Sequence, residues 1–223
     1  MEKQFWIERW QAGQTGFNQA TPSADLVAYW SALAVPAGSR ILVPLAGKSV
    51  DMLWLVQQGY RVLGVEIAEQ AVRAFFDDNG LDPQIHESAI GSHFVSGDIE
   101  LVCADIFDVG AEQADTCAAV YDRAALIALP PAMRQRYAAH LSSILPSDCR
   151  ALLLTMQYEQ ERMNGPPFSV PRDEVLQLYG QDWQVQELAR REIIKDEPRF
   201  AQRGLDSMTA LTFKLERSQS GSN

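Results

Sequence analysis

The chain lacks long apolar segments and has no excess of basic residues. None of the apolar runs in its 223 residues approaches the roughly 20 residues needed to cross a bilayer. Its start, MEKQFWIERW, has no apolar core of the kind found in secretory signal peptides. The net charge is −10, whereas nucleic acids and anionic membranes select basic surfaces. We therefore expect a cytoplasmic protein that binds neither nucleic acid nor a membrane.

Paired cysteines and metal-ligand spacings are also missing. The three cysteines, Cys103, Cys117 and Cys149, include no C-x-x-C pair, and the three histidines are scattered over positions 86, 93 and 140. An odd number of cysteines bordering apolar stretches is typical of reduced core thiols. We expect neither a disulfide framework nor a metal site.

The third absence is the glycine fingerprint of dinucleotide-binding proteins. Residues 40–66, RILVPLAGKSVDMLWLVQQGYRVLGVE, are typical of a buried strand, a tight turn, a helix and a second buried strand. The turn has only Gly47 where G-x-G-x-x-G would wrap a pyrophosphate, and Glu66 follows 66 − 47 = 19 residues later, close to the spacing of roughly 20 for a ribose-binding acid. This disfavours a dinucleotide and favours a ligand with a ribose and no phosphate, such as S-adenosylmethionine. The same residues are equally compatible with an ordinary strand–helix–strand unit ending in a surface glutamate.

The remaining hydrophobic pattern indicates a single α/β domain over residues 1–223, with a disordered tail at 218–223. Strands are expected at 41–43, 61–65, 99–103, 117–121 and 150–156, and a terminal pair at 183–194 and 206–216. Five helix-linked strands and a terminal pair match the class I methyltransferase fold, a seven-stranded, mostly parallel sheet with helices on both faces. Residues 81–97 are rich in turn residues, so we expect a short hairpin there.

Residues 1–35 are expected to form a helical cover in front of the sheet. Trp6 and Trp10 fall on one side of a first short helix, and Thr21-Pro22 would begin a second, since proline suits the first turn of a helix. The aromatic helix either docks on the core or acts as a lid whose rings face a cationic sulfonium.

Charged residues follow two further strands. Asp105 comes after one strand, and Asp122-Arg123 come directly after the next. Because the carboxyl ends of parallel strands meet at one edge, these residues should lie near Gly47 and Glu66. Asp105 would meet an adenine amino group or cap a turn, and Asp122 would orient Arg123 or cap the next helix.

Seven local strings, in the same order and over nearly the whole chain, resemble the thiopurine S-methyltransferase family. They are Trp6-x-x-x-Trp10, Thr15-Gly16-Phe17-Asn18-Gln19, Pro44-Leu45-Ala46-Gly47-Lys48, Gly64-Val65-Glu66-Ile67, Asp105-Ile106-Phe107-Asp108, Tyr121-Asp122-Arg123-Ala124-Ala125-Leu126 and Gly165-Pro166-Pro167-Phe168-x-Val170-Pro171. Each string is weak alone, but the set is specific. The P-L-x-G-K turn matters most, because it replaces the usual glycine-rich methyltransferase turn.

The resemblance implies S-adenosyl-L-methionine as cofactor and assigns roles by similarity. The implied cofactor-binding residues are Trp6, Trp10, Leu45, Gly47, Glu66, Ile67, Asp105, Ile106 and Arg123, with Glu66 on the ribose hydroxyls and the two tryptophans closing over the cofactor. The implied acceptor-side residues are Phe17, Arg123, Pro167 and Arg199. Lys48 is expected to face solvent rather than the cofactor.

The implied reaction is methyl transfer to an aromatic or heterocyclic thiol such as a thiopurine. Such thiols ionise readily, so a basic residue beside the acceptor could favour the thiolate without a general base. We hypothesise that Arg123 does this, assisted by Arg199, in a monomeric enzyme whose partner is a small-molecule thiol. The alternatives are methylation of selenium or tellurium compounds or of another small anionic acceptor, a nicotinamide oxidoreductase, and a cofactor-binding protein without catalysis.

Overall fold

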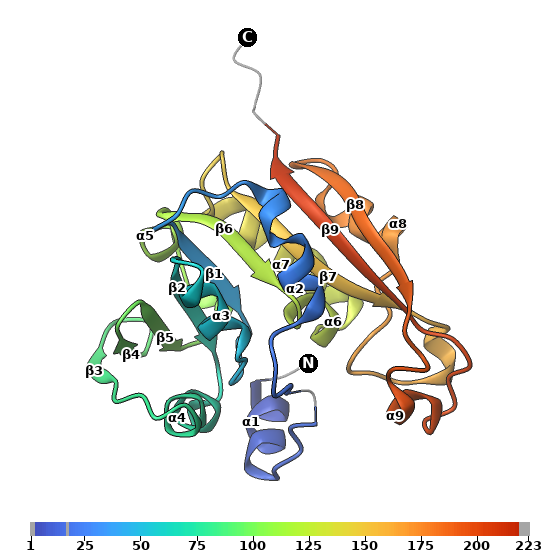
Figure 1. Ribbon diagram of the computed structural model, residues 1–223, viewed down its shortest axis with the longest axis horizontal. Coiled ribbons are helices and arrows are strands. Elements are labelled where there is room, and N and C mark those ends of the chain that lie inside the picture. The colour runs from blue at the N-terminus through green and yellow to red at the C-terminus, as the bar shows by residue number, and fades with distance from the viewer. Residues whose placement is uncertain (1–2, 17, 219–223) are drawn as a thin grey trace.

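The computed structural model describes residues 3–16 and 18–218, and its strands form a nine-stranded sheet within these ranges (Figure 1). The strands are β1 Arg40–Pro44, β2 Arg61–Glu66, β3 Gln84–Glu87, β4 Ser92–Ser96, β5 Ile99–Cys103, β6 Cys117–Asp122, β7 Arg150–Gln157, β8 Trp183–Glu192 and β9 Thr209–Arg217. Their order across the sheet is β3-β4-β5-β2-β1-β6-β7-β9-β8. Strands β5, β2, β1, β6 and β7 are parallel, and β9 runs antiparallel between β7 and β8. The predicted class I arrangement is confirmed, and the expected hairpin, β3–β4, extends the sheet at one edge.

Helices cover both faces of this sheet (Figure 1). They are α1 Lys3–Gln11, α2 Ala24–Tyr29, η1 Trp30–Leu33, α3 Asp51–Gln57, α4 Glu69–Asp78, η2 Ile106–Asp108, α5 Ala111–Ala114, α6 Ala125–Ala128, α7 Pro131–Ile144, η3 Gln160–Arg162, α8 Arg172–Tyr179 and α9 Pro198–Ala201. Leu42 of β1 packs in the core shared with α7 and α8, whereas Ile41 and Val43 pack in the core shared with α2, α3 and α4. A strand buried on both faces must be apolar at every position, which is why β1 reads as a continuous apolar run.

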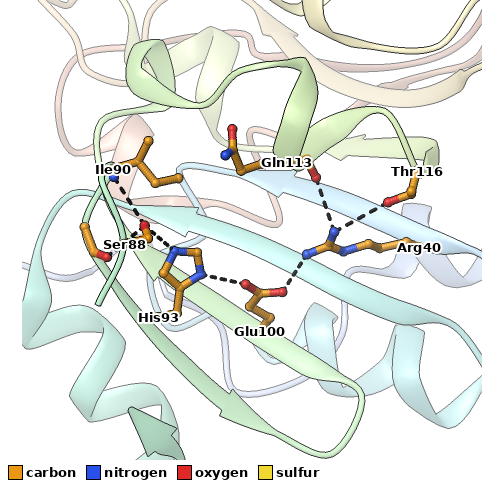
Figure 2. Close-up of polar contacts among 8 residues, drawn as sticks. Arg40, Ser88, Ile90, His93, Glu100, Gln113 and Thr116 are labelled. Atoms are coloured by element: carbon orange, nitrogen blue, oxygen red, sulfur yellow. Dashed lines mark hydrogen bonds and ion pairs between the residues drawn. The ribbon is translucent and has the colours of Figure 1, made fainter. Parts of the chain in front are cut away.

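A polar chain joins the edge hairpin to the centre of the sheet (Figure 2). Arg40 of β1 donates from Nη2 to Glu100 Oε2 at 2.5 Å, and the other Glu100 oxygen lies 2.6 Å from His93 Nδ1. His93 Nε2 lies 2.7 Å from the Ser88 hydroxyl in the hairpin loop. Since these residues come from β1, β5, β4 and the loop, this series of hydrogen bonds fixes the hairpin against the parallel strands.

The N-terminal cover begins its second helix later than the sequence predicted. Helix α2 starts at Ala24, so Pro22 precedes the helix instead of lying in its first turn. Ser23 lies outside the helix with φ −56° and ψ 128°, and its amide donates to Asp51 Oδ1 at 2.7 Å, a tertiary contact that the local sequence does not reveal. Leu26, Trp30 and Leu33 of this segment are buried.

The described part of the chain contains no helix with the length and apolar character required to cross a membrane. At the C-terminus, the Ser218 amide donates to the Asp182 carbonyl at 2.9 Å. The rest of the expected disordered tail lies outside the described residues.

Candidate active site

The turn after β1 is fastened to the end of β2 by one carboxylate. Glu66 accepts a hydrogen bond from the Gly47 amide through Oε2 and another from the Ala68 amide through Oε1, each at 2.8 Å. Burial raises the pKa of Glu66 above its ordinary value, and the hydrogen bonds from the backbone amides oppose this rise. The turn also places Leu45 and Gly47 at positive φ, 48° and 54°. The sequence spacing between Gly47 and Glu66 therefore reflects a direct contact.

A cleft of about 1260 Å³ opens at the carboxyl ends of the parallel strands. Typical small-molecule pockets have roughly 300–1,000 Å³, so this cleft can hold two ligands side by side. Every site residue predicted from the sequence that the structure describes lines it: Trp6, Trp10, Leu45, Gly47, Glu66, Ile67, Asp105, Ile106, Arg123, Pro167 and Arg199. Phe17 lies outside the described residues.

Helix α1 closes the β1–β2 side of the cleft. Trp10 is buried against Ala68 and Ala71, and a Cβ atom on Gly47 would lie 3.4 Å from Trp10 Cζ2. Lys3 Nζ lies 2.9 Å from Asp105 Oδ2, which ties the start of α1 to the end of β5. Asp105 also accepts from the Phe107 amide at 3.0 Å, so it caps η2 as well as lining the cleft. The aromatic helix is thus docked on the turn and borders the cavity.

Arg123 is paired with an aspartate other than its neighbour. Its Nη1 donates to Asp51 Oδ2 at 3.0 Å, whereas Asp122 accepts from the Ala125 and Leu126 amides and from the Tyr137 hydroxyl at 2.7 Å. Asp122 therefore caps α6, and the idea that it orients Arg123 is wrong. Burial raises the pKa of Asp122 to about 6 despite these three donors.

The far wall of the cleft is held by loop contacts. Arg199 donates from Nη1 to the Gly16 carbonyl of the cover and from Nε to Glu197 at 2.9 Å. The Pro167 carbonyl accepts from the Tyr158 hydroxyl at 2.6 Å. Arg134, only 1% exposed, lies 2.5 Å from Glu174 and also donates to the Leu129 and Ser169 carbonyls. These bonds fix the loops that contain Pro167 and Arg199.

Three polar residues of the cleft were missed at the sequence level. Asp51 and Ser23 form the contact described above, and Asn18 lines the cleft with a buried Nδ2 that has no hydrogen-bond partner among the described residues. Asp51 had a usable signal, since it lies four residues after Gly47 in the first turn of the helix that leaves β1. Lys48 does not line the cleft; its Nζ lies 2.6 Å from Asp78 at the surface.

Comparison with known proteins decides the family. The sequence pattern of the family described as thiopurine S-methyltransferase matches residues 1–218. The chain belongs to the thiopurine S-methyltransferase family. A protein named "Thiopurine S-methyltransferase" from Bordetella parapertussis is 50% identical over 217 residues, covering 97% of this chain and 99% of the relative. A protein of the same name from Xanthomonas campestris pv. campestris is also 50% identical, covering 97% and 100%.

Solved structures show the fold of this family member independently. Phosphoethanolamine N-methyltransferase 2 of Haemonchus contortus in complex with S-adenosyl-L-methionine superposes with a TM-score of 0.69 at 11% identity, covering 98% of this chain and 60% of that chain. A Burkholderia thailandensis 1,6-didemethyltoxoflavin-N1-methyltransferase with bound S-adenosylhomocysteine gives 0.64 at 13% identity, covering 97% and 87%. The methyltransferase fold is therefore established.

The cleft fits S-adenosylmethionine. Glu66 supplies an anionic acceptor beside the Gly47 turn, and the unpartnered Asn18 Nδ2 is a donor that a ligand can satisfy. Carboxylates and aromatic faces suit a cationic sulfonium, and both occur in this wall, as Glu66 and Asp105 and as Trp6 and Trp10. The glycine-poor turn offers no cradle for a pyrophosphate, so a nicotinamide dinucleotide fits less well.

Proposed function

We propose that this chain transfers the methyl group of S-adenosylmethionine to the sulfur of an aromatic or heterocyclic thiol, such as a thiopurine. The observation that carries the proposal is the position of Arg123, a guanidinium in the wall of the cleft, in the same cavity as the Gly47–Glu66 turn. The named relatives and the family support the same acceptor class.

We assign the β1–β2–β5 side of the cleft to the cofactor. Glu66 accepts from the ribose hydroxyls, while the backbone around Leu45 and Gly47 supplies polar contacts. Ile67, Ile106 and Asp105 border the adenine, and the rings of Trp6 and Trp10 cover the bound molecule. All of these residues line the cleft.

When bound, S-adenosylmethionine supplies an electrophilic methyl group on a sulfonium. The residues of the cleft would orient the acceptor sulfur toward the bound cofactor, and orientation of this kind can contribute roughly 7–11 kcal/mol at best. The guanidinium of Arg123 would favour the acceptor thiolate over the thiol, whose proton is released to bulk water when the acceptor binds. Arg199 closes the cover over the cleft through Gly16 and excludes water.

A small anionic acceptor, such as a selenium or tellurium oxyanion, is the second candidate. The observation that favours it is a set of guanidinium groups that line the cleft: Arg123 after β6, Arg191 in β8, and Arg199 and Arg203 between β8 and β9. Guanidinium groups bind oxyanions as readily as they favour thiolates.

The test is production of S-adenosylhomocysteine with a panel of acceptors: 6-mercaptopurine, other aromatic thiols, selenite and tellurite. We expect turnover of the aromatic thiols that is strongly reduced in Arg123→Ala. Turnover of the oxyanions alone would replace the first candidate with the second. Calorimetric binding of S-adenosylmethionine without turnover of any acceptor would favour a cofactor-binding protein, and preference for NAD in the same titration would overturn the methyltransferase assignment.

We further propose that the enzyme acts as a monomer in the cytoplasm. All three cysteines are free, and burial raises the pKa values of the Cys103 and Cys117 thiols to about 11 and of Cys149 to about 12, which suits inert core thiols in a reducing compartment. Within the described ranges, the exposed large apolar side chains are the isolated Val27 and Ile85. Light scattering of the purified protein should give the mass of one chain, 24.8 kDa.

A further inference from the structure

Asp51 is a fully buried carboxylate on which three segments converge. Its side chain is 0% exposed, and it pairs with Arg123 in the wall of the cleft, which both residues line. Oδ1 accepts from the Ser23 amide at 2.7 Å, and Oδ2 accepts from the Tyr121 hydroxyl at 2.9 Å and from Arg123 Nη1 at 3.0 Å. The donors come from the N-terminal cover, from β6 and from the residue that follows β6.

Burying a carboxylate at this position is energetically unfavourable. Removing a charge from water costs several kcal/mol, which is recovered only when the partners are well placed. A hydrophobic residue at the start of α3 would avoid this cost. The arrangement is explained if the carboxylate performs a task that an apolar side chain cannot, namely fixing a cation at the edge of the cleft.

The pair with Asp51 fixes the orientation of the Arg123 guanidinium. A guanidinium has five N–H donors in a rigid plane, so a single anchored nitrogen largely sets the direction of the others. In the described part of the chain, Arg123 makes its ion pair with Asp51 and no other hydrogen bond, and its side chain is 22% exposed. The remaining donors are therefore available to a ligand in the cleft.

The charge of Asp51 also affects electrostatic repulsion in the cleft. A bare guanidinium near a bound sulfonium would repel it, because like charges a few ångströms apart interact strongly at low dielectric. A carboxylate 3.0 Å from the guanidinium reduces this repulsion while leaving the N–H donors in place.

We propose that Asp51 is a positioning residue that aims the free donors of Arg123 at the acceptor and couples their direction to docking of the cover through Ser23. This rests on the proposed function. Asp51 itself does not touch the acceptor, and it acts through Arg123. Its contribution to turnover must therefore depend on the arginine.

A double-mutant cycle tests this dependence. Asp51→Asn keeps the shape of the side chain and removes its charge, and it is measured in the wild-type and in the Arg123→Ala background with 6-mercaptopurine as acceptor. In the wild-type background we expect kcat/KM for the acceptor to fall about 10- to 100-fold, as is common when a hydrogen-bonded support of a functional group is removed. In the Arg123→Ala background we expect Asp51→Asn to change kcat/KM by less than about threefold, because coupled residues are not additive.

Three further measurements separate positioning from general stability. The dissociation constant of S-adenosylhomocysteine, measured by calorimetry, should stay within about threefold of the wild-type value in Asp51→Asn, since the cofactor-side wall is untouched. Asp51→Glu, which restores the charge, should recover part of the lost activity. Tyr121→Phe is the matched control, because it removes another donor to the same Oδ2 atom without changing the charge, and its activity should stay near that of the wild type.

These measurements distinguish a positioning role of Asp51 from a structural one. An equal loss from Asp51→Asn in both backgrounds, or an Asp51→Asn protein that does not fold, gives Asp51 a structural role and overturns the proposal. Absence of thiol turnover by the wild-type enzyme would instead refute the proposed function. The two failures are therefore distinguishable.

Discussion

The two sides of the cleft are built in different ways. On the side that we assign to the cofactor, the residues stand at the ends of adjacent parallel strands or in the short segments that follow them, and Glu66 is held by two backbone amides. These residues are Leu45, Gly47, Glu66, Ile67 and Ile106. On the side that we assign to the acceptor, the positions of Arg123, Pro167 and Arg199 each depend on a side-chain or loop contact with another element.

The difference appears in the sequence separation of the contacts. Gly47 and Glu66 are 19 residues apart, within one strand–helix–strand unit. Asp51 and Arg123 are 72 residues apart, and Gly16 and Arg199 are 183 apart. The Gly47–Glu66 contact therefore forms within one local unit, whereas the Asp51–Arg123 and Gly16–Arg199 contacts form only when distant segments of the sheet and the cover come together.

Removing Arg123 should damage the acceptor side alone. We expect Arg123→Ala to lower kcat/KM for an aromatic thiol about 100- to 1,000-fold, comparable to the loss of one preorganised donor in other active sites. Calorimetry should show cofactor affinity almost unchanged. Arg123→Lys is the control, because it keeps a cation on the buried Asp51 while losing the guanidinium fork. A large loss of cofactor affinity would place Arg123 on the cofactor side, and unchanged turnover at every pH would remove it from the mechanism.

The free energy of unfolding should depend on pH through Asp122, the buried carboxyl next to Arg123 in the sequence. Burial raises the pKa of this carboxyl from its ordinary value of 3.8 to about 6, so the folded state binds its proton more tightly than the unfolded state. The stabilisation is complete below about pH 4 and is lost as pH rises through about 6, with a magnitude of roughly 2–3 kcal/mol. Asp122→Asn cannot titrate at this position.

Urea unfolding of wild type and Asp122→Asn between pH 4 and 7 measures this effect directly. The free energy of unfolding of the wild type, relative to the variant, should decrease over that range. A gap that does not vary with pH would mean that Asp122 is ionised throughout and that its three donors outweigh its burial.

The same division explains what the sequence could predict. The βαβ unit, the one-glycine turn and the acid at the end of β2 follow from hydrophobic period and spacing, because the β1–β2 pairing and the contacts of Glu66 with Gly47 and Ala68 lie within one unit. Since parallel strands bring their carboxyl ends to one edge, even Asp105 and Arg123 could be placed in the cleft from their positions in the chain.

Pairings between distant segments could not be predicted. Nothing near Asp51 indicates that its partner is Arg123, and nothing near Pro22 indicates that the Ser23 amide donates to a buried carboxylate. For the same reason Asp122 was offered two roles, and only the structure shows that it caps α6 rather than orienting the arginine beside it. These contacts depend on tertiary geometry, which hydrophobic period does not encode.

On the cofactor side, Glu66→Gln should weaken binding of S-adenosylmethionine by about 10-fold, since a hydrogen bond to a charged acceptor contributes about 1.5 kcal/mol or more. Turnover at saturating cofactor should change far less. Glu69→Gln is a matched control, because Glu69 lies three residues away and makes an exposed pair with Arg73. Thermal unfolding of Glu66→Gln is needed alongside, as the new amide faces two backbone donors. Unchanged cofactor affinity would show that the carboxylate only braces the Gly47 turn.

The smallest effect on stability and binding is expected at Lys48, the charged residue of the P-L-x-G-K turn. Its ammonium pairs with Asp78 at the surface, and exposed ion pairs contribute about 0–1 kcal/mol. Lys48→Met should therefore lower the free energy of unfolding by less than about 1 kcal/mol and leave cofactor affinity and turnover unchanged. A clear drop in affinity would mean that Lys48 leaves Asp78 to reach the cofactor. In that case the Gly47–Glu66 turn would also depend on a long side chain that reaches the ligand, and the contrast between a turn held by local contacts and a wall held by contacts between distant segments would no longer hold.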